Sequence, residues 1–189
     1  GRKVFIHAGS GGVGTIAIQL AKHLGAFVAT TTSTNNVEWV KALGADVVID
    51  YKKQNFESIL QDYDVVLNSL GADELEKSLT ILRPGGQLIS ISGPPTPQFA
   101  EEQKLFWGLG LVMRLLSSST RRKARKRNVR YAFVFMRASG AQLGEITALI
   151  ESGIIKPVID RSFPFESTAE ALSYVEQGRS KGKVIIKLK

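Results

Sequence analysis

Cysteine is absent from this sequence of 189 residues, and histidine occurs only twice. Without cysteine, these residues form no disulfide framework, no thiolate metal site and no cysteine nucleophile. No apolar run reaches the roughly 18 residues of a membrane-spanning helix, and the first residues lead directly into a short hydrophobic run rather than a signal sequence. We therefore expect a protein without a membrane span or a metal site, located in the cytoplasm.

Acidic residues are missing from one stretch of the chain. The sequence has 25 Lys and Arg against 17 Asp and Glu, a net charge of +8, and seven of the basic residues lie within residues 121–130. Without these seven charges the net charge falls to +1. Because the basicity is local, the composition argues against a protein that binds nucleic acid over its whole surface. The hydrophobic share of 43% is sufficient for the core of one domain with an appendage.

Short apolar runs alternate with segments of helical periodicity over the first half of the chain. We expect strands at residues 4–6, 27–31, 47–49, 65–67 and 87–92, with a turn at residues 83–86. The helices between them are expected from residue 16 to 24, 37 to 43, 56 to 60 and 74 to 82. Because a strand covered on both faces need not alternate polar with apolar residues, this pattern predicts an α/β fold with a doubly wound parallel sheet.

The alternation breaks after Gly93, where three prolines open an irregular stretch. A helix is expected at residues 99–116, followed by the basic run as a solvated helix end or a mobile loop. The remaining elements are expected as a strand at 131–136, a helix at 141–150, a strand at 158–163, a helix at 168–175 and a strand at 184–188. We therefore predict one domain over residues 1–157, with an insertion at about 94–130, and a separate C-terminal segment over residues 158–189.

A glycine motif lies between the first strand and the first helix. Gly9-x-Gly11-x-x-Gly14 in this position is typical of a Rossmann dinucleotide-binding turn. Gly9 allows a tight turn, Gly11 lets a pyrophosphate approach the backbone, and Gly14 lets the helix pack close to the strand. Free amides at the helix start would hold the phosphate charge.

The end of the second strand carries hydroxyl groups where many such sites carry an acid. Residues 29–33 read Ala-Thr-Thr-Thr-Ser, without the carboxylate that would accept hydrogen bonds from an adenosine ribose in a NAD site. Hydroxyl groups can donate to a 2′-phosphate, which a carboxylate would repel. The pattern therefore favours NADP (NADPH) over NAD.

Several segments together resemble a known family. The residues from His7 to Lys22, the Leu43-Gly-Ala-Asp46 turn, Leu82-Arg-Pro-Gly-Gly86 and Gly178-Arg-Ser-Lys-Gly-Lys183 are similar to the medium-chain dehydrogenase/reductase superfamily, and within it to zinc-independent, NADPH-dependent quinone oxidoreductases. The resemblance covers most of the chain and is weak over residues 94–130. It implies a Rossmann nucleotide-binding fold.

The resemblance also implies a set of cofactor-binding residues. The pyrophosphate would bind at the glycine turn, and a tyrosine after the third strand would lie near the adenine. Many relatives have a lysine that binds the 2′-phosphate at the position of Asn36. In this chain, binding of the 2′-phosphate would instead depend on Thr32, Ser33 and Arg179 or Lys183. The ends of the fourth and fifth strands would contact the ribose and nicotinamide. The full set is Gly9, Gly11, Gly12, Val13, Gly14, Thr32, Ser33, Asn36, Tyr51, Asn68, Ser69, Leu70, Ser90, Ile91, Ser92, Phe135, Arg179 and Lys183.

The implied activity is hydride transfer from NADPH to a quinone or a conjugated enone. Relatives place a catalytic domain before the nucleotide-binding domain, so the resemblance implies that this chain is a fragment and that its catalytic residues would lie in that missing domain. Residues 158–189 would return to the missing catalytic domain. The fragment would bind nucleotide but be inactive alone. The resemblance further implies a homodimer that pairs through the edge strand at residues 131–136.

Other chemistries fit the sequence less well. None of the four tyrosines begins a Tyr-x-x-x-Lys motif, and Gly182-Lys183 precedes a valine and a strand, which excludes a phosphate loop. A strand end and a helix surface explain His7 and His23 without catalysis. The alternative function is a non-catalytic nucleotide-sensing or nucleic-acid-associated module that uses residues 121–130, although this run has no interleaved aromatic residues for base stacking. A methyltransferase with a similar glycine loop is a third candidate.

Overall fold

The computed structural model describes residues 1–188. The helices are α1 (Gly14–His23), α2 (Val37–Ala42), α3 (Ala72–Ile81), α4 (Pro97–Glu102), α5 (Trp107–Leu116), α6 (Ser118–Lys126), α7 (Gly140–Glu151) and α8 (Thr168–Glu176). The strands are β1 (Lys3–Ile6), β2 (Phe27–Thr32), β3 (Val47–Asp50), β4 (Tyr63–Asn68), β5 (Leu82–Ser90), β6 (Arg130–Phe133), β7 (Ile159–Pro164) and β8 (Lys183–Lys187). Short 3₁₀ helices are η1 (Thr34–Asn36), η2 (Phe56–Ser58) and η3 (Phe165–Ser167).

The strands of the described residues form two sheets. Six of them form one sheet in the order β3-β2-β1-β4-β5-β6, and β7 and β8 form a second, two-stranded sheet. The pairs β1 with β4, β4 with β5, β5 with β6, and β2 with β3 are all parallel. This strand order is that of doubly wound nucleotide-binding folds. The predicted α/β Rossmann fold is therefore confirmed.

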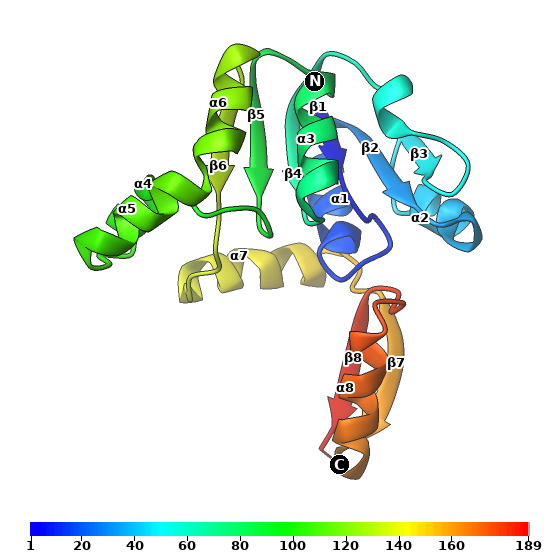
Figure 1. The fold of residues 1–189 in the computed structure, drawn as a ribbon. Coiled ribbons are helices and arrows are strands. Elements are labelled where there is room, and N and C mark those ends of the chain that lie inside the picture. Colours follow the sequence, from blue (N-terminus) through cyan, green and yellow to red (C-terminus); the bar gives the residue numbers. More distant parts are fainter. Residues whose placement is uncertain (189) are drawn as a thin grey trace. The chain divides into compact units, whose positions relative to one another are not determined.

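By its internal contacts the chain divides into two compact units. Unit 1 consists of residues 1–7 and 53–138 and contains β1, β4, β5 and β6. Its core contains Phe5, Val66 and Leu88, whose side chains are fully buried on three neighbouring strands. Helix α3 packs on β4 and β5, and α6 packs on β6 (Figure 1). The rings of Phe5 and Phe56 lie 4.9 Å apart, so η2 also closes this core.

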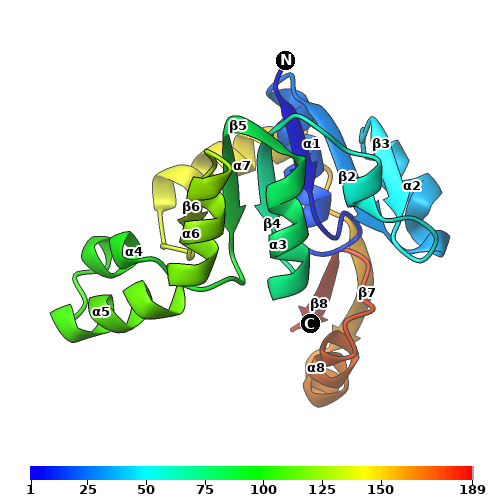
Figure 2. The ribbon, with the colours of Figure 1, turned by 45° about the horizontal axis from the view of Figure 1, so that its top comes forward.

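Unit 2 consists of residues 8–52 and the described residues from 139 onward. Helix α1 packs on β2, and α2 packs on β3. Gln19 on α1 connects distant parts of the sequence, because its side chain donates to Lys156 O at 3.1 Å and accepts from Lys156 N at 2.8 Å. Strands β7 and β8 lie beside α8 (Figure 2), and Tyr174 on that helix donates to Asp160 at 2.7 Å.

Some predicted elements have different bounds in the structure. Residues 83–86 belong to β5 instead of forming a turn before it, and residues 56–60 form the short η2 rather than an α-helix. The helix predicted at 99–116 is divided into α4 and α5. Residues 121–126 of the basic run lie in helix α6, which agrees with the helix alternative given for this run. The edge strand predicted at 131–136 ends at Phe133. The domain boundary at residue 157 stays a prediction.

The described residues contain neither a membrane-spanning helix nor a cluster of metal-binding side chains. None of their helices combines the length and the apolarity that crossing a membrane requires. Nowhere in the same residues do three or more His, Asp or Glu side chains gather in a group that would hold a metal ion.

Candidate functional site

The turn after β1 forms in unit 2 through a short set of backbone hydrogen bonds. Gly9 N donates to Thr31 O at 2.9 Å, which connects the turn to β2, and Gly11 N donates to Ala8 O at 2.9 Å. Ala8 has a left-handed backbone with φ of 52°, an uncommon conformation for a residue with a side chain. The chain therefore reverses sharply before α1 begins at Gly14.

The three glycines of the motif differ in the space around them. A Cβ atom on Gly9 would lie 2.3 Å from Thr30 Oγ1, and one on Gly14 would lie 2.3 Å from Ala8 O. A Cβ atom on Gly11 would meet only Ala8 O, at 3.3 Å. Packing within the turn therefore requires glycine at positions 9 and 14. Position 11 leaves the outer side of the turn open to a ligand.

The start of α1 presents unsatisfied donors. Within the described residues, the amides of Gly12, Val13 and Gly14 donate to no acceptor, and Val13 offers no capping side chain. The first amides of a helix, together with the positive end of its dipole, form a binding site for an anion. The turn thus has the donors that a diphosphate requires.

A lysine from the end of the chain lies against this turn. Gly182 N donates to Ser10 O at 2.9 Å, which holds the start of β8 at the turn. A Cβ atom on Gly12 would lie 2.9 Å from Lys183 Nζ. Gly182 has φ of 76°, and a Cβ atom there would lie 2.3 Å from Val158 O, so only glycine fits this close approach. The structure therefore brings Lys183 to the turn, whereas Arg179 lies exposed in the loop after α8.

The ends of β2 and β3 bring a second group of predicted residues together. Thr32 lies opposite Asp50 in the parallel register, and Tyr51 N donates to Thr32 O at 3.1 Å. The Thr32 hydroxyl is buried and has no hydrogen-bond partner among the described residues. Asn36 Nδ2 donates to Ser33 Oγ at 3.0 Å, whereas the Tyr51 side chain is exposed. The cluster thus offers one buried hydroxyl without a partner.

An acid that the sequence analysis did not assign to the site lies at the end of β3. Asp50 Oδ2 accepts from Thr34 Oγ1 at 2.7 Å, and Asp50 Oδ1 accepts from Lys52 N at 3.1 Å. The sequence analysis considered only residues 29–33 at the end of β2, whereas this carboxylate comes from the neighbouring strand β3. The parallel register was the signal that could have found it.

Unit 1 contains a separate polar cluster at the ends of β4 and β5. Ser90 Oγ donates to Asn68 Oδ1 at 2.9 Å and accepts from Gly93 N at 2.8 Å, and Ser92 Oγ donates to Leu70 O at 2.6 Å. Asn68 is fully buried, and its Nδ2 has no partner among the described residues. A buried donor without an acceptor costs free energy unless something binds to it.

The other predicted residues of unit 1 lie around or away from this cluster. Ile91 N donates to Asn68 O at 3.0 Å, and Ser69 follows directly after β4. Phe135 does not lie on a strand; it is 62% exposed, and its ring packs 6.2 Å from the ring of Phe99. The structure thus groups residues 68–70 with residues 90–92 but shows no contact between Phe135 and them.

Two further side chains near these strands have shifted pKa values. Tyr131 donates to Pro94 O at 2.7 Å, and burial raises the pKa of its phenol to about 12. Burial lowers the pKa of His7 to about 4, so its ring is neutral at pH 7. His7 Nε2 lies 2.7 Å from Ser78 Oγ, and the ring packs against Phe5 and Phe56. We therefore assign His7 to the core.

Comparisons with known proteins agree with the fold and the turn. The Rossmann-type strand order first places the chain among the nucleotide-binding α/β folds. The family model of the zinc-binding dehydrogenases matches residues 43–186. The chain belongs to this family of medium-chain dehydrogenases/reductases, which confirms the resemblance found in the sequence.

The relatives include several reductases. The chain is 35% identical over 190 residues to the 2-methylene-furan-3-one reductase of Solanum lycopersicum, and 33% identical over 190 residues to the chloroplastic NADPH-dependent alkenal/one oxidoreductase of Arabidopsis thaliana. Each alignment covers 98% of this chain but 40% of the relative. The quinone oxidoreductase of Coxiella burnetii has a similar structure, with a TM-score of 0.82 at 28% identity, over 100% of this chain and 53% of that one. The chain therefore spans about half or less of the length of these proteins.

Proposed function

We propose that this chain is the cofactor-binding part of an oxidoreductase that transfers hydride from NADPH to a quinone or a conjugated enone. The printed functions of the relatives support this proposal, since they include an NADPH-dependent alkenal/one oxidoreductase and a quinone oxidoreductase. The nucleic-acid alternative has no such support. The chain spans about half or less of the length of these relatives, and we propose that the catalytic residues lie in a preceding domain.

The observation that carries the proposal is the set of three free amides at the start of α1. We infer that the amides of Gly12, Val13 and Gly14 donate to the diphosphate of the cofactor, and that Lys183 Nζ contributes a positive charge to the same group. When bound, the cofactor supplies the reactive hydride. The residues of the turn hold it in place.

The adenosine end would bind at the ends of β2 and β3. The Thr32 hydroxyl has no partner among the described residues and can donate to a 2′-phosphate, with Ser33 and Asn36 beside it and the exposed Tyr51 ring near the adenine. Both carboxylate oxygens of Asp50 already accept hydrogen bonds from the chain itself. We propose that NADPH binds more tightly than NADH because the Thr32 hydroxyl can donate to the 2′-phosphate, with Arg179 as a further cation for the phosphate.

The polar cluster of unit 1 would contact the ribose and the nicotinamide. Asn68 Nδ2 is a buried donor without a described partner, and an oxygen atom of the cofactor would satisfy it. Ser69 and Leu70 follow Asn68 in the chain, and Ile91 N and Ser92 Oγ donate hydrogen bonds to Asn68. The proposed role of Phe135 rests on the family resemblance alone.

The remaining expectations are proposals about the whole protein. Strand β6 is the last strand in the sheet order, so a homodimer through this edge stays a proposal, now for residues 130–133. Independence from zinc, a cytoplasmic location and a C-terminal segment that returns to a preceding domain are proposals of the same kind.

Calorimetric titration with NADPH and NADH tests the proposed function. We expect NADPH to bind at least tenfold more tightly than NADH. Lys183→Ala should weaken both cofactors by roughly ten- to a hundredfold if the lysine contacts the diphosphate, because both cofactors carry that group. Lys187→Ala at the other end of β8 is the matched control and should change neither affinity. Failure of both cofactors to bind, or tighter binding of NADH, would contradict the proposal.

A further inference from the structure

Helix α5 in unit 1 is apolar and largely exposed. It contains seven large apolar side chains in ten residues, and none of its residues is buried. Trp107 is 76% exposed, Leu115 is 67% exposed and Leu116 is 61% exposed. Helix α4 packs along one side of α5, where Gly110 faces Ala100 (Figure 2). Apolar surface of this extent in water indicates an interaction site.

The helix that follows is strongly basic. From residue 103 to residue 144 the sequence has ten Lys and Arg and no Asp or Glu, and six of the ten lie in residues 121–127. Arg122, Arg125, Lys126 and Arg127 are exposed. Of the basic residues in α6, Lys123 is paired with an acid, Glu76 on α3. The positive charge of α6 is therefore largely uncompensated within unit 1.

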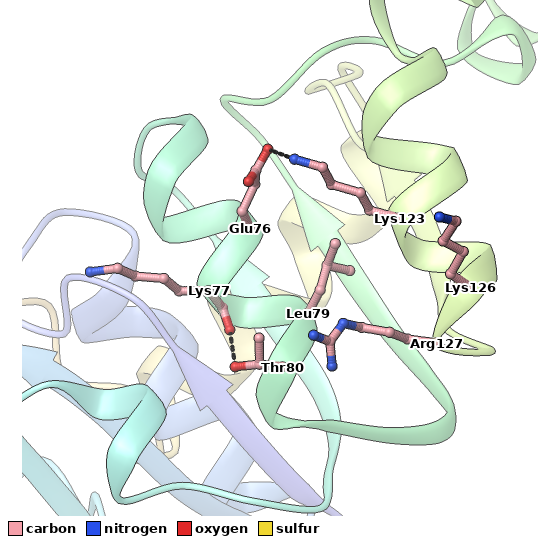
Figure 3. Close-up of a pocket in the computed structure, with 7 residues that line it drawn as sticks. All are labelled: Glu76, Lys77, Leu79, Thr80, Lys123, Lys126 and Arg127. Carbon is pink, nitrogen blue, oxygen red and sulfur yellow. Dashed lines mark hydrogen bonds and ion pairs between the residues drawn. The ribbon is translucent and has the colours of Figure 1, made fainter.

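Part of this charge borders an open groove between α3 and α6. The groove has a volume of about 590 Å³. Its lining consists of Glu76, Lys77, Leu79 and Thr80 from α3, Lys123 and Lys126 from α6, and Arg127 directly after α6. Figure 3 shows the Lys123 side chain extended from α6 to Glu76 on α3, and the Arg127 side chain directed toward α3 from the residue after α6. A phosphate-bearing headgroup would find several cations there.

We propose that α5 and α6 form a docking surface for an anionic lipid membrane. The apolar side chains of α5 would enter the boundary between headgroups and acyl chains, and the cations of α6 would contact the headgroups. Stable attachment to a membrane surface generally needs two signals, such as an apolar insertion and a polybasic patch, and this segment has both. Ten helical residues extend about 15 Å, half of the roughly 30 Å hydrocarbon core, so α5 would lie in the interface without crossing it.

The combination of charge and apolar surface favours lipid over other partners. A nucleic acid would contact the cations of α6 but would leave the exposed leucines of α5 in water. A second copy of the chain packed through this surface would place two uncompensated α6 helices close together, which like-charge repulsion disfavours. An anionic membrane accommodates both features at once. This proposal does not depend on the proposed cofactor.

Co-sedimentation of the full chain with vesicles tests the proposal. We expect binding to vesicles that contain phosphatidylglycerol and much weaker binding to vesicles of phosphatidylcholine alone. The triple variant Arg122→Gln, Arg125→Gln, Lys126→Gln should bind anionic vesicles about a hundredfold more weakly, at about 1 kcal/mol for each basic residue. The control variant Lys41→Gln, Lys156→Gln, Lys187→Gln changes the net charge equally at exposed positions elsewhere and should retain most of the binding.

Fluorescence of Trp107 tests insertion directly. The chain has two tryptophans, Trp39 and Trp107. Anionic vesicles should shift the emission to shorter wavelength, and Trp107→Phe should abolish this shift while the protein still sediments with the vesicles. Leu115→Ser with Leu116→Ser should weaken sedimentation at least tenfold, and circular dichroism checks that the variants fold.

Four results would overturn the proposal. The first is failure of the full chain to sediment with anionic vesicles. The second is an equal loss of binding in the two charge variants, since binding would then reflect only net charge. The third is self-association that the leucine variant abolishes while vesicle binding persists. The fourth is tight binding to duplex DNA without any shift of the Trp107 emission when vesicles are added.

Discussion

Helices α1 and α5 have the same length of ten residues but opposite relations to the core. Helix α1 buries Gly14, Thr15, Ile18 and Gln19 in unit 2. Helix α5 contains more large apolar residues and buries none of its ten. The difference shows that an apolar helix is buried only when another element covers it. A mixed helix with glycine and threonine on the correct face packs closely, whereas a more apolar helix can remain on the surface.

Alanine substitutions of glycine should show the largest contrast between the two helices. Gly14→Ala places a Cβ atom 2.3 Å from Ala8 O, and we expect it to lower the free energy of unfolding by about 3 kcal/mol through overpacking. Gly110→Ala in α5 meets only Ala100 Cβ at 3.7 Å and should raise the stability by up to about 1 kcal/mol, because alanine favours the helix. Urea unfolding of both variants measures the effect. Equal stabilities of the two variants would show that the turn before α1 accommodates the added methyl group as easily as α5 does.

A second glycine separates binding from folding within the turn before α1. Gly11→Ala meets only Ala8 O, at 3.3 Å, so the fold should be retained with little loss of stability. The added methyl group would occupy the side where we propose that the diphosphate approaches. We expect the affinity for NADPH to fall by roughly a hundredfold, or about 2.7 kcal/mol, measured by calorimetry. Gly110→Ala serves as the control and should bind NADPH like the parent chain; unchanged binding by Gly11→Ala would remove the turn from the site.

The two histidines extend the comparison of buried and exposed positions to pH. His7 is buried and its pKa is lowered to about 4, whereas His23 at the end of α1 is exposed. Between pH 4 and pH 6.5 the unfolded chain binds a proton at His7 that the folded chain does not, so stability falls as the pH decreases through this window. From pH 7 to pH 5 this group should contribute a loss of about 2 kcal/mol.

Urea unfolding of His7→Gln and His23→Gln at these two pH values checks the pH effect. His7→Gln should lose this part of the pH dependence, and His23→Gln should retain it. The carboxylates Asp46, Asp64 and Asp160 have lowered pKa values. They cause a loss of stability only at more acidic pH than the window of His7 between pH 4 and pH 6.5. The same pH dependence in both histidine variants would contradict the assignment of His7 to the core.

The smallest effect is expected for the exposed leucines of α5. Leu116→Ser removes a side chain that is 61% exposed and should change the free energy of unfolding by less than about 0.5 kcal/mol. Ile18→Ser in α1 affects a fully buried side chain and should cost more than about 3 kcal/mol. Thermal or urea unfolding of this pair measures the difference. A large loss in Leu116→Ser would mean that α5 contributes to the core after all.

Most of the fold that depends on local sequence patterns was predicted. The Gly9-x-Gly11-x-x-Gly14 turn, the order of strands and helices up to β5 and the final strand-helix-strand segment depend on patterns within a few residues. The exceptions are residues 56–58, which form a 3₁₀ helix, and residues 83–86, which belong to β5. The carboxylate of Asp50 was missed at the adenosine end because it reaches that position through the pairing of β3 with β2. The break between α4 and α5 was also missed. Apolar periodicity alone does not reveal whether a neighbour covers a helix, so the exposure of α5 is known only from the structure.

The hydrogen bond from Gly182 N to Ser10 O has a consequence for biosynthesis. A ribosome produces the residues that complete this turn about 170 positions after the turn itself. The nascent chain can therefore form the intervening strands and helices in order, yet the turn acquires its lysine only after those elements have been made. A translation product truncated a few residues before Gly182 would contain the entire glycine motif and still lack the positive charge beside it.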